Sequence, residues 1–475
     1  MSFTKKLCGA AGAIGLSLLA ASPAFAADLV KGPDAAAMAT MWNKGDVAWM
    51  LVSSALVLMM SIPGLALFYG GLVRTKNMLS VLMQVFMIVS VTGLLWCCYG
   101  YSMAFTSGGE NHFFGGLSKA FLMGVDGTTS GATFSNNVYL PELVFVVFQM
   151  TFAMITPALI VGAFAERVKF SGLIIFIVLW STIVYYPMAH MVWYWAGPDF
   201  LVDAPTDYGM LWGWGALDFA GGTVVHINAG IAGLAGAIVL GKRSGYPKEP
   251  MPPHSLTMTM IGASLLWVGW FGFNAGSNLE ANGVTAVAFV NTMVATCAAA
   301  VSWALVEKVA HGKPSLLGAV SGAVAGLVAI TPASGYAAPM TSIVLGFVVS
   351  PICYLFVAKV KPKLGYDDSL DVFGVHCIGG IVGALGTAIV AAPSLGGQGY
   401  FDYTVFPAAF HPEQYSIGAQ LITQLKAVLV TLLLSGGVSF VLFYAINKTI
   451  GLRVSVEAEH EGVDLAEHGE RAYNM

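Results

Sequence analysis

Eleven apolar windows, each about 20 residues long or longer, constrain the fold of this chain more than any other feature. A window of about 20 apolar residues can cross the hydrocarbon core of a bilayer as a helix, and a helix satisfies its own backbone hydrogen bonds there. Only 10% of the 475 residues are charged and 57% are hydrophobic, whereas about 25% of a soluble domain is charged. We therefore predict an all-α polytopic membrane protein with eleven transmembrane helices. The windows lie at 46–73, 78–105, 142–165, 170–195, 219–241, 255–275, 283–307, 315–334, 339–360, 372–391 and 420–447.

Several functional classes find no support in the composition and motifs. The net charge is -4 and no large basic cluster occurs, so nucleic-acid binding is not expected. The cysteines and histidines show no spacing typical of a metal site. The windows contain no H-E-x-x-H motif, no G-x-S-x-G motif and no paired catalytic carboxylates. We expect no cofactor, no metal and no catalytic residues, and we expect that the chain is not an enzyme.

The N-terminal segment has the pattern of a cleaved secretory signal. Lys5 and Lys6 precede an apolar stretch that ends at Ala24-Phe25-Ala26, an A-x-A cleavage site. We predict that residues 1–26 form a signal peptide and that 27–45 form a periplasmic segment. The alternative is a first transmembrane helix that carries a chance alanine motif.

Lysine and arginine alternate between the connections of the predicted helices. Connections on one side contain several basic residues, while those on the other are nearly free of them, apart from Lys119. The positive-inside rule then places the N-terminus outside and the tail, 448–475, in the cytoplasm. This orientation, together with the signal peptide, predicts a protein of the bacterial inner membrane. Lys426 is an exception, because it falls within the last window near its outer end.

An internal repeat relates two parts of the chain. The run VHINAGIAGLAG at 225–236 matches VHCIGGIVGALG at 375–386, with histidines 150 residues apart. That separation is five windows, an odd number, so the two copies cross the membrane in opposite directions. We predict two inverted five-helix repeats, 46–241 and 255–391, with 420–447 as an extra helix.

The repeat predicts where two histidines lie. His226 and His376 fall at similar depths from opposite membrane surfaces, so their rings are expected near each other close to the midplane. The alternative is two unrelated core histidines, each bonded to a backbone carbonyl.

A second group of residues is expected at the outer face. Phe152, Trp193, Phe273 and Ser277 come from three windows and reach similar outer depths. For each aromatic residue alone, an interfacial belt or plain lipid contact is the alternative. Asp218 precedes the fifth window; it is either an electrostatic attraction for a cation or a helix N-cap, and we favour the structural role. Asp371 occupies a position related to that of Asp218, near the start of the tenth window, and we interpret it as structural too.

The sequence resembles the ammonium transporter family (Amt/Mep/Rh) from about residue 42 to the C-terminus. The resemblance lies in long motifs in the family's order: PGLALFYGGLVRTKNMLS (63–80), ITPALIVGAFAERVKFS (155–171), AHMVW (189–193), LDFAGGTVVHINAGIAGLAGAIVLGKR (217–243), WFGFNAGSNL (270–279), KPSLLGAVSGAVAGLVAITPASG (313–335) and DDSLDVFGVHCIGGIVG (367–383).

The resemblance implies roles for the outer residues. Phe152, Trp193 and Ser277 would recruit ammonium, and Phe152 with Phe273 would form a gate beneath. Asp218 would be the buried acid beside this site. The long segment 106–141 departs from the family pattern, which leaves the shape of the entrance open.

The resemblance also implies a pore and partners. His226 and His376 would be twin histidines of the pore, with Leu65 and Val372 in its aliphatic wall. The family forms homotrimers, and its bacterial members bind a PII-type signalling protein at the cytoplasmic face. The tail, 451–474, resembles the family's regulatory tail.

These expectations combine into one functional hypothesis. The chain would recruit ammonium at an aromatic site, deprotonate it and conduct ammonia through an apolar pore. The alternative is an ammonium sensor that signals through its tail, although the tail contains no recognisable catalytic domain. Conduction of carbon dioxide or another neutral gas would use the same pore and stays open.

Overall fold

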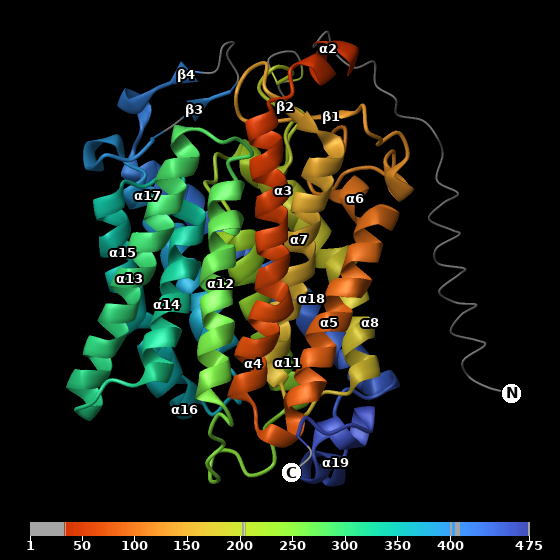
Figure 1. The fold of residues 1–475 in the computed structure, drawn as a ribbon, viewed down its shortest axis with the longest axis vertical. Coiled ribbons are helices and arrows are strands. Elements are labelled where there is room, and N and C mark those ends of the chain that lie inside the picture. The colour runs from red at the N-terminus through yellow and green to blue at the C-terminus, as the bar shows by residue number, and fades with distance from the viewer. Residues whose placement is uncertain are drawn as a thin grey trace, which may run out of the picture.

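The computed structural model describes residues 33–473, apart from residues 34, 202, 203, 205, 400 and 404–408. Figure 1 shows long helices side by side in one bundle. The helix α2 (Ala35–Thr40) and the strands lie at one end, which we call the strand end. The helix α19 (Val456–Glu461) lies at the other, the tail end. The predicted signal peptide, 1–26, falls outside the described residues.

Eleven helices in the described part of the chain are long and apolar enough to cross a membrane. Spans 1 to 4 are α3 (Lys44–Met59), η1 (Met60–Leu65) and α4 (Ala66–Leu72); η2 (Thr75–Asn77), α5 (Met78–Leu95), η3 (Trp96–Gly100) and α6 (Tyr101–Phe105); α7 (Glu142–Ile160) and η5 (Val161–Phe164); and α8 (Phe170–Trp180), η6 (Ser181–Tyr185) and α9 (Tyr186–Trp193). Spans 5 to 8 are η7 (Gly222–Ile227) and α11 (Asn228–Leu240); α12 (Leu256–Gly276); α13 (Gly283–His311); and α14 (Leu316–Ile330) and η8 (Thr331–Ala333). Spans 9 to 11 are α15 (Pro339–Leu355), η9 (Phe356–Val360) and α16 (Lys361–Leu364); η10 (Phe373–Cys377) and α17 (Ile378–Val390); and α18 (Ile417–Thr449).

The prediction of an all-α membrane protein with eleven transmembrane helices is confirmed for the described residues. The predicted and observed ends differ by a few residues. Span 5 begins at Gly222 rather than 219, because Gly221 adopts a left-handed φ of 113° that interrupts the helix before it. Span 7 continues to His311, where Gly312 ends the helix with a φ of 79°.

Short elements fill the connections between the spans. At the strand end, β1 (Ser130–Ala132) pairs antiparallel with β2 (Tyr139–Pro141), and β3 (Phe401–Asp402) pairs antiparallel with β4 (Ala409–Phe410). The remaining elements are η4 (Ala120–Leu122), α10 (Met210–Gly213), η11 (Pro393–Leu395), η12 (Pro412–Gln414) and η13 (Asp464–His468).

Polar caps fix where several spans begin. The Asn43 side chain accepts the N–H of Gly45 at 2.7 Å at the start of span 1. Ser255, Asn282, Ser315 and Ser416 accept backbone N–H groups in the same way at spans 6, 7, 8 and 11. Each cap satisfies N–H groups that the first helical turn leaves unpaired.

Span 1 is not one continuous helix. Ile62 has φ -131° and ψ 109°, an extended conformation inside the apolar window, and Pro63 follows it. Spans 2, 4 and 9 contain single π-helical turns, η3, η6 and η9. Spans 5 and 10 both begin with π-helical turns, η7 and η10. Such turns interrupt regular α-helices and are frequent at functional sites.

The two repeats contact each other through glycines. An added Cβ at Gly230 in span 5 would lie 2.4 Å from the backbone nitrogen of Cys377 in span 10. The absence of a side chain at Gly230 therefore lets the two helices approach closely in the centre of the bundle.

Buried ion pairs join the two repeats at the tail end. The Arg243 guanidinium contacts both carboxylate oxygens of Asp367, at 2.9 Å through Nε and at 2.8 Å through Nη2, and it contacts Glu166 at 3.2 Å. Arg74 Nε donates to Glu166 at 2.9 Å. Burial would raise the pKa of Glu166, but Arg74 and Arg243 hold it below its ordinary value. Bidentate arginine contacts of this kind also fix geometry.

The C-terminal tail folds back onto these connections. The Glu459 carboxylate accepts the backbone N–H of Ser244 at 2.5 Å and Arg453 Nη2 at 2.7 Å. The Asp464 carboxylate accepts the N–H groups of Leu79 and Ser80 at 3.0 and 2.7 Å, at the start of span 2. Tail residues are thus bonded to spans and connections of the first repeat.

Candidate functional site

The rings of His226 and His376 meet edge to edge, through their Nδ1 atoms, in the interior of the bundle. Their Nδ1 atoms are 3.2 Å apart and their centroids 5.4 Å apart, with an angle of 24° between the ring planes. Their exposed fractions are 1% and 4%. Each lies in the π-helical turn that begins its span, His226 in η7 and His376 in η10. Because spans 5 and 10 enter from opposite ends of the bundle, the two turns meet in its interior.

The hydrogen bonding of this pair is incomplete on one side. One ring must donate its Nδ1–H to the Nδ1 of the other, since a neutral imidazole has one donor and one acceptor nitrogen. The buried Nε2 of His226 has no hydrogen-bond partner within the described chain. A buried polar atom without a partner is costly, so this nitrogen is available to a small polar molecule.

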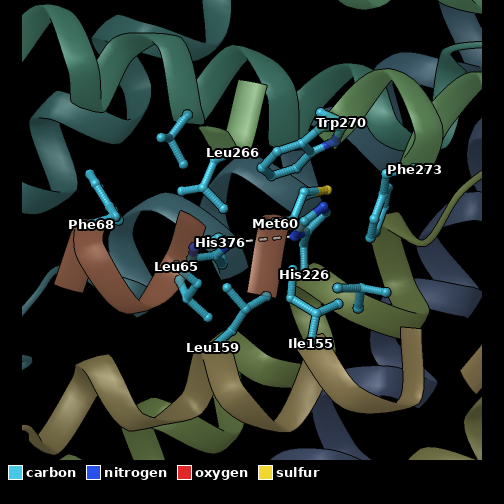
Figure 2. A pocket seen from close by; sticks show the side chains of 12 residues that line it. Met60, Leu65, Phe68, Ile155, Leu159, His226, Leu266, Trp270, Phe273 and His376 are labelled. Carbon is cyan, nitrogen blue, oxygen red and sulfur yellow. Dashed lines mark hydrogen bonds between the residues drawn. The ribbon is translucent and has the colours of Figure 1, made fainter. Parts of the chain in front are cut away.

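A narrow cavity runs beside the two rings. Figure 2 shows the imidazoles between Phe273 on one side and Phe68 on the other, with Trp270 and Leu266 facing Ile155 and Leu159 across the space. Its volume is about 10 Å³, about the room that one water-sized molecule needs. The lining is apolar apart from the histidines and the indole N–H: Met60, Leu65, Phe68, Ile155, Leu159, Val225, His226, Leu266, Trp270, Phe273, Val324 and His376.

Aromatic rings close the cavity toward the strand end. Phe152 and Phe273 are buried, with centroids 4.3 Å apart, and the Phe273 ring lies 6.0 Å from that of His226. The Trp193 ring meets Phe152 edge to face at 5.7 Å. Trp193, Phe152, Phe273 and His226 thus form a continuous row of rings, and Trp193 is only partly buried.

Ser277 lies one helical turn beyond Phe273. It follows the last residue of α12, and its hydroxyl donates to the Phe273 carbonyl at 2.8 Å. The proton of the hydroxyl is therefore used, while its lone pairs can still accept a hydrogen bond.

Asp218 closes the start of span 5. Its carboxylate accepts the N–H groups of Gly221, Gly222 and Thr223 at 2.9, 2.5 and 2.8 Å, that of Val224 at 3.3 Å, and the Thr223 hydroxyl. Burial raises the pKa of Asp218, and the bonds from Thr223, Gly222 and Gly221 oppose that rise. These contacts are those of a helix N-cap.

Asp218 also contacts the aromatic row, through its backbone carbonyl. The Trp193 indole N–H donates to the Asp218 carbonyl at 3.0 Å. The cap of span 5 and the position of the Trp193 ring are therefore coupled through one residue.

The structural equivalent of Asp218 in the second repeat is Asp368, not Asp371. Asp368 accepts the N–H groups of Val372 and Phe373 at 3.0 and 2.8 Å and so caps span 10. The interpretation of Asp371 as the related residue was wrong, because Asp371 has a φ of 61° and pairs with Lys361. Burial and the Asp371 charge raise the pKa of Asp368 to about 7.

The two expected wall residues differ in position. Leu65 lines the cavity. Val372 does not line it; the Val372 side chain instead packs where Gly162 and Gly233 leave room, on the tail-end side of the histidines.

Trp270, Met60, Ile155 and Leu159 line the cavity but were missed from the sequence. Apolar residues carry no signal that separates a pore wall from a helix core. Trp270 offered a clue, because it lies three residues before Phe273 and so falls on the same helix face. Among the described residues there is no group of three or more His, Cys, Asp or Glu that could hold a metal ion.

Comparisons with known proteins identify relatives over nearly the whole chain. The model of the Ammonium Transporter Family matches residues 48–473. An ammonium transporter of Aquifex aeolicus (strain VF5) is 45% identical over 433 residues, which cover 91% of this chain and 94% of the relative. The crystal structure of Candida albicans Mep2 has a TM-score of 0.76 and 33% identity and covers 92% of each chain. A solved Sensor Amt Protein has a TM-score of 0.78 and 26% identity and covers 89% of this chain and 98% of its own.

Proposed function

The chain belongs to the ammonium transporter family, and on that premise we propose a path by which it moves its substrate. Ammonium is recruited near Trp193, Phe152 and Ser277 at the strand end. It passes between Phe152 and Phe273 and gives up a proton to the unpaired Nε2 of His226 on the cavity. The ammonia that remains crosses the apolar cavity along His226 and His376.

Recruitment of the cation rests on the aromatic row. An aromatic face attracts a cation, by about 2 kcal/mol or more when the cation is desolvated, and tryptophan attracts most strongly. Trp193 is the partly buried member of the row, and its indole N–H is already bonded to Asp218. Ser277 retains hydroxyl lone pairs that can accept an N–H of ammonium.

Deprotonation would make the protein selective for ammonium over potassium. When one N–H bond of ammonium breaks, its electron pair stays on nitrogen and the proton passes to an acceptor. When His226 is the ring that donates its Nδ1–H to His376, its unpaired Nε2 on the cavity carries a lone pair and is the proton acceptor. Potassium has no proton to give up, and an intact cation would pay a large penalty in the apolar cavity.

The observation that carries this proposal is the histidine pair itself. Two imidazoles share one N–H across 3.2 Å, and one of them leaves a buried nitrogen unpaired beside a narrow apolar cavity. A pair that served packing alone would have its nitrogens satisfied by protein groups. Two rings in contact also resist carrying two charges, so they would exchange protons as a unit.

The surroundings of the pore belong to the same proposal. We infer that the strand end faces the outside and the tail end the cytoplasm of a bacterial inner membrane, after removal of 1–26 as a signal peptide. Support comes from the basic residues, such as Arg74, Arg243 and Lys361, that gather at the tail end. A homotrimer and a PII-type partner at the tail end complete the proposal, by family resemblance.

Ammonium-evoked current in proteoliposomes on a supported membrane tests the path. In the proposal the proton taken up by His226 passes to His376 through their shared Nδ1 contact and leaves on the tail-end side, so charge crosses with ammonia. Wild-type protein should therefore give current with ammonium and none with potassium. His226→Ala and His376→Ala should each lower the ammonium current or admit potassium, while the oligomer in detergent stays unchanged. His311→Asn is a matched control, because its ring bonds to Tyr354 near the end of span 7, away from the residues that line the cavity. Normal currents and selectivity in both alanine variants would refute the proposed role of the pair.

The sensor alternative makes a different prediction. The similarity to a Sensor Amt Protein keeps this alternative in view. A sensor would bind ammonium without moving it, so uptake of labelled methylammonium by a transport-deficient host separates the two functions. No uptake by well-expressed wild-type protein would favour the sensor.

A further inference from the structure

We propose that the hydrogen bond between Trp270 and Thr331 holds the imidazole of His226 in its working orientation. Both are positioning residues, since they act on the substrate path through His226. This inference rests on the proposed function of the histidine pair.

The His226 ring needs support of this kind. Among the described residues, its side chain forms one hydrogen bond, to His376, and its Nε2 is unpaired. The terminal torsion of a histidine is broad, with no sharply preferred angle. A single hydrogen bond at one corner therefore leaves the ring free to tilt about that contact.

Trp270 supplies a flat surface against this ring. The indole lies nearly parallel to the imidazole, at 20° and a centroid distance of 5.4 Å, and its exposed fraction is 2%. Phe273 covers the ring from the strand-end side at 6.0 Å and 29°. Figure 2 shows Trp270 and Phe273 on two sides of His226, with His376 opposite. The plane of His226 is thus set mainly by the plane of Trp270.

Thr331 in turn sets the plane of Trp270. The indole Nε1 donates to Thr331 Oγ1 at 2.9 Å, and the Thr331 hydroxyl donates to the Leu327 carbonyl at 2.8 Å. A hydroxyl has one proton, so Thr331 acts here as the acceptor and its direction is fixed. Thr331 has an exposed fraction of 0%, so no solvent can replace this acceptor.

The backbone around Thr331 is tied to the span that carries His226. Pro332 packs against Gly222 at the start of η7, where an added Cβ would come within 2.7 Å. The Phe219 N–H donates to the Pro332 carbonyl at 3.1 Å. Thr331, which accepts the Trp270 bond, and η7, which carries His226, are therefore held at a fixed distance. This keeps the Trp270 indole in a constant position relative to the His226 imidazole.

Thr331→Val and Thr331→Ser separate this role from packing. Valine has nearly the shape of threonine but no acceptor, whereas serine retains the hydroxyl. Thr331→Val should lower the ammonium current about 10-fold, since small displacements of positioned groups cost that much or more. It should also shift the pH dependence of the current, while Thr331→Ser stays close to wild type. Thr296→Val controls for loss of a buried hydroxyl, because Thr296 Oγ1 donates within its own helix.

Trp270→Phe completes a double-mutant cycle. It keeps a flat ring but removes the N–H, so it should reproduce the effect of Thr331→Val. The double variant should then be no worse than either single variant, because both remove the same bond. Additive losses, or equal currents in Thr331→Val and Thr331→Ser, would overturn the inference. Absence of ammonium current in the wild type would instead refute the proposed function.

Discussion

Asp218→Asn tests the cap of span 5, and the number of hydrogen bonds that it removes can be counted from the structure. The carboxylate accepts five donors, two on Oδ1 and three on Oδ2. An asparagine can offer only one acceptor oxygen, and its amide group would turn two N–H donors toward the N–H groups of the helix start. At least two of the five hydrogen bonds are therefore lost, whichever way the amide is turned.

The expected cost follows from the number of bonds lost. A hydrogen bond to a charged group contributes about 1.5–3 kcal/mol, so loss of two predicts a destabilisation of about 3–6 kcal/mol. At an exposed cap, Asp→Asn would be expected to change the stability very little, since asparagine and aspartate cap helices about equally well. Asp368→Asn is the internal comparison. Asp368 accepts two N–H groups, one on each oxygen, so asparagine loses one bond and the predicted destabilisation is about half that of Asp218→Asn.

Thermal melting of the purified protein in detergent, followed by fluorescence-detected size exclusion, measures both variants. An unfolding entropy of about 2.1 cal/mol/K per residue converts the predicted loss for Asp218→Asn into a fall of about 3–6 °C in Tm. Asp368→Asn should fall by about half as much. A Tm of Asp218→Asn within about 1 °C of wild type, or a larger fall for Asp368→Asn, would refute the reasoning.

Three further predictions concern other parts of the molecule. Trp193→Leu should weaken the preference for ammonium at the entrance, which competition of other cations against methylammonium uptake measures; unchanged competition would contradict the role. Gly230→Ala should lower both Tm and ammonium current, because its Cβ would lie 2.4 Å from the Cys377 nitrogen and force the histidine rings apart; a normal current would show that the helices tolerate separation. The pKa of Glu166 is lowered by Arg74 against the effect of burial, so its contribution is complete above the ordinary carboxylate pKa and is lost as pH falls through the lowered value. Tm of the wild type should therefore drop more steeply below about pH 4 than Tm of Glu166→Gln, and parallel profiles would count against this.

Much of the fold could be predicted because lipid imposes a simple rule. Only helices of about 20 apolar residues can cross as single segments, so the hydropathy windows marked the eleven spans to within a few residues. The interruptions could not be predicted in the same way. Ile62 is as apolar as its neighbours, yet its backbone is extended. Pro63 was the one local signal for that break.

The candidate site was only partly visible in the sequence. The repeat brought His226 and His376 to matched positions, and the structure places their rings in contact. The error at Asp371 arose from counting back from the window edge rather than from the histidine. Asp218 precedes His226 by the same number of residues as Asp368 precedes His376. The distance from aspartate to histidine is the same in both repeats. The edge of an apolar window is a poorer reference, because apolar residues on either side shift it.

The contact between the two histidines has a consequence for how such a chain can arise. A single five-helix unit carries one imidazole and one capped helix start, so by itself it holds half of a conduit. It can complete the other half only by meeting a copy of itself that was inserted upside down. A protein that had only one copy of this unit would therefore need to enter the membrane in both directions to build the same pair, whereas a tandem copy with an odd number of spans is inverted automatically. Once the two copies were fused, each half could acquire its own distribution of Lys and Arg in its connections, which would fix its orientation in the membrane.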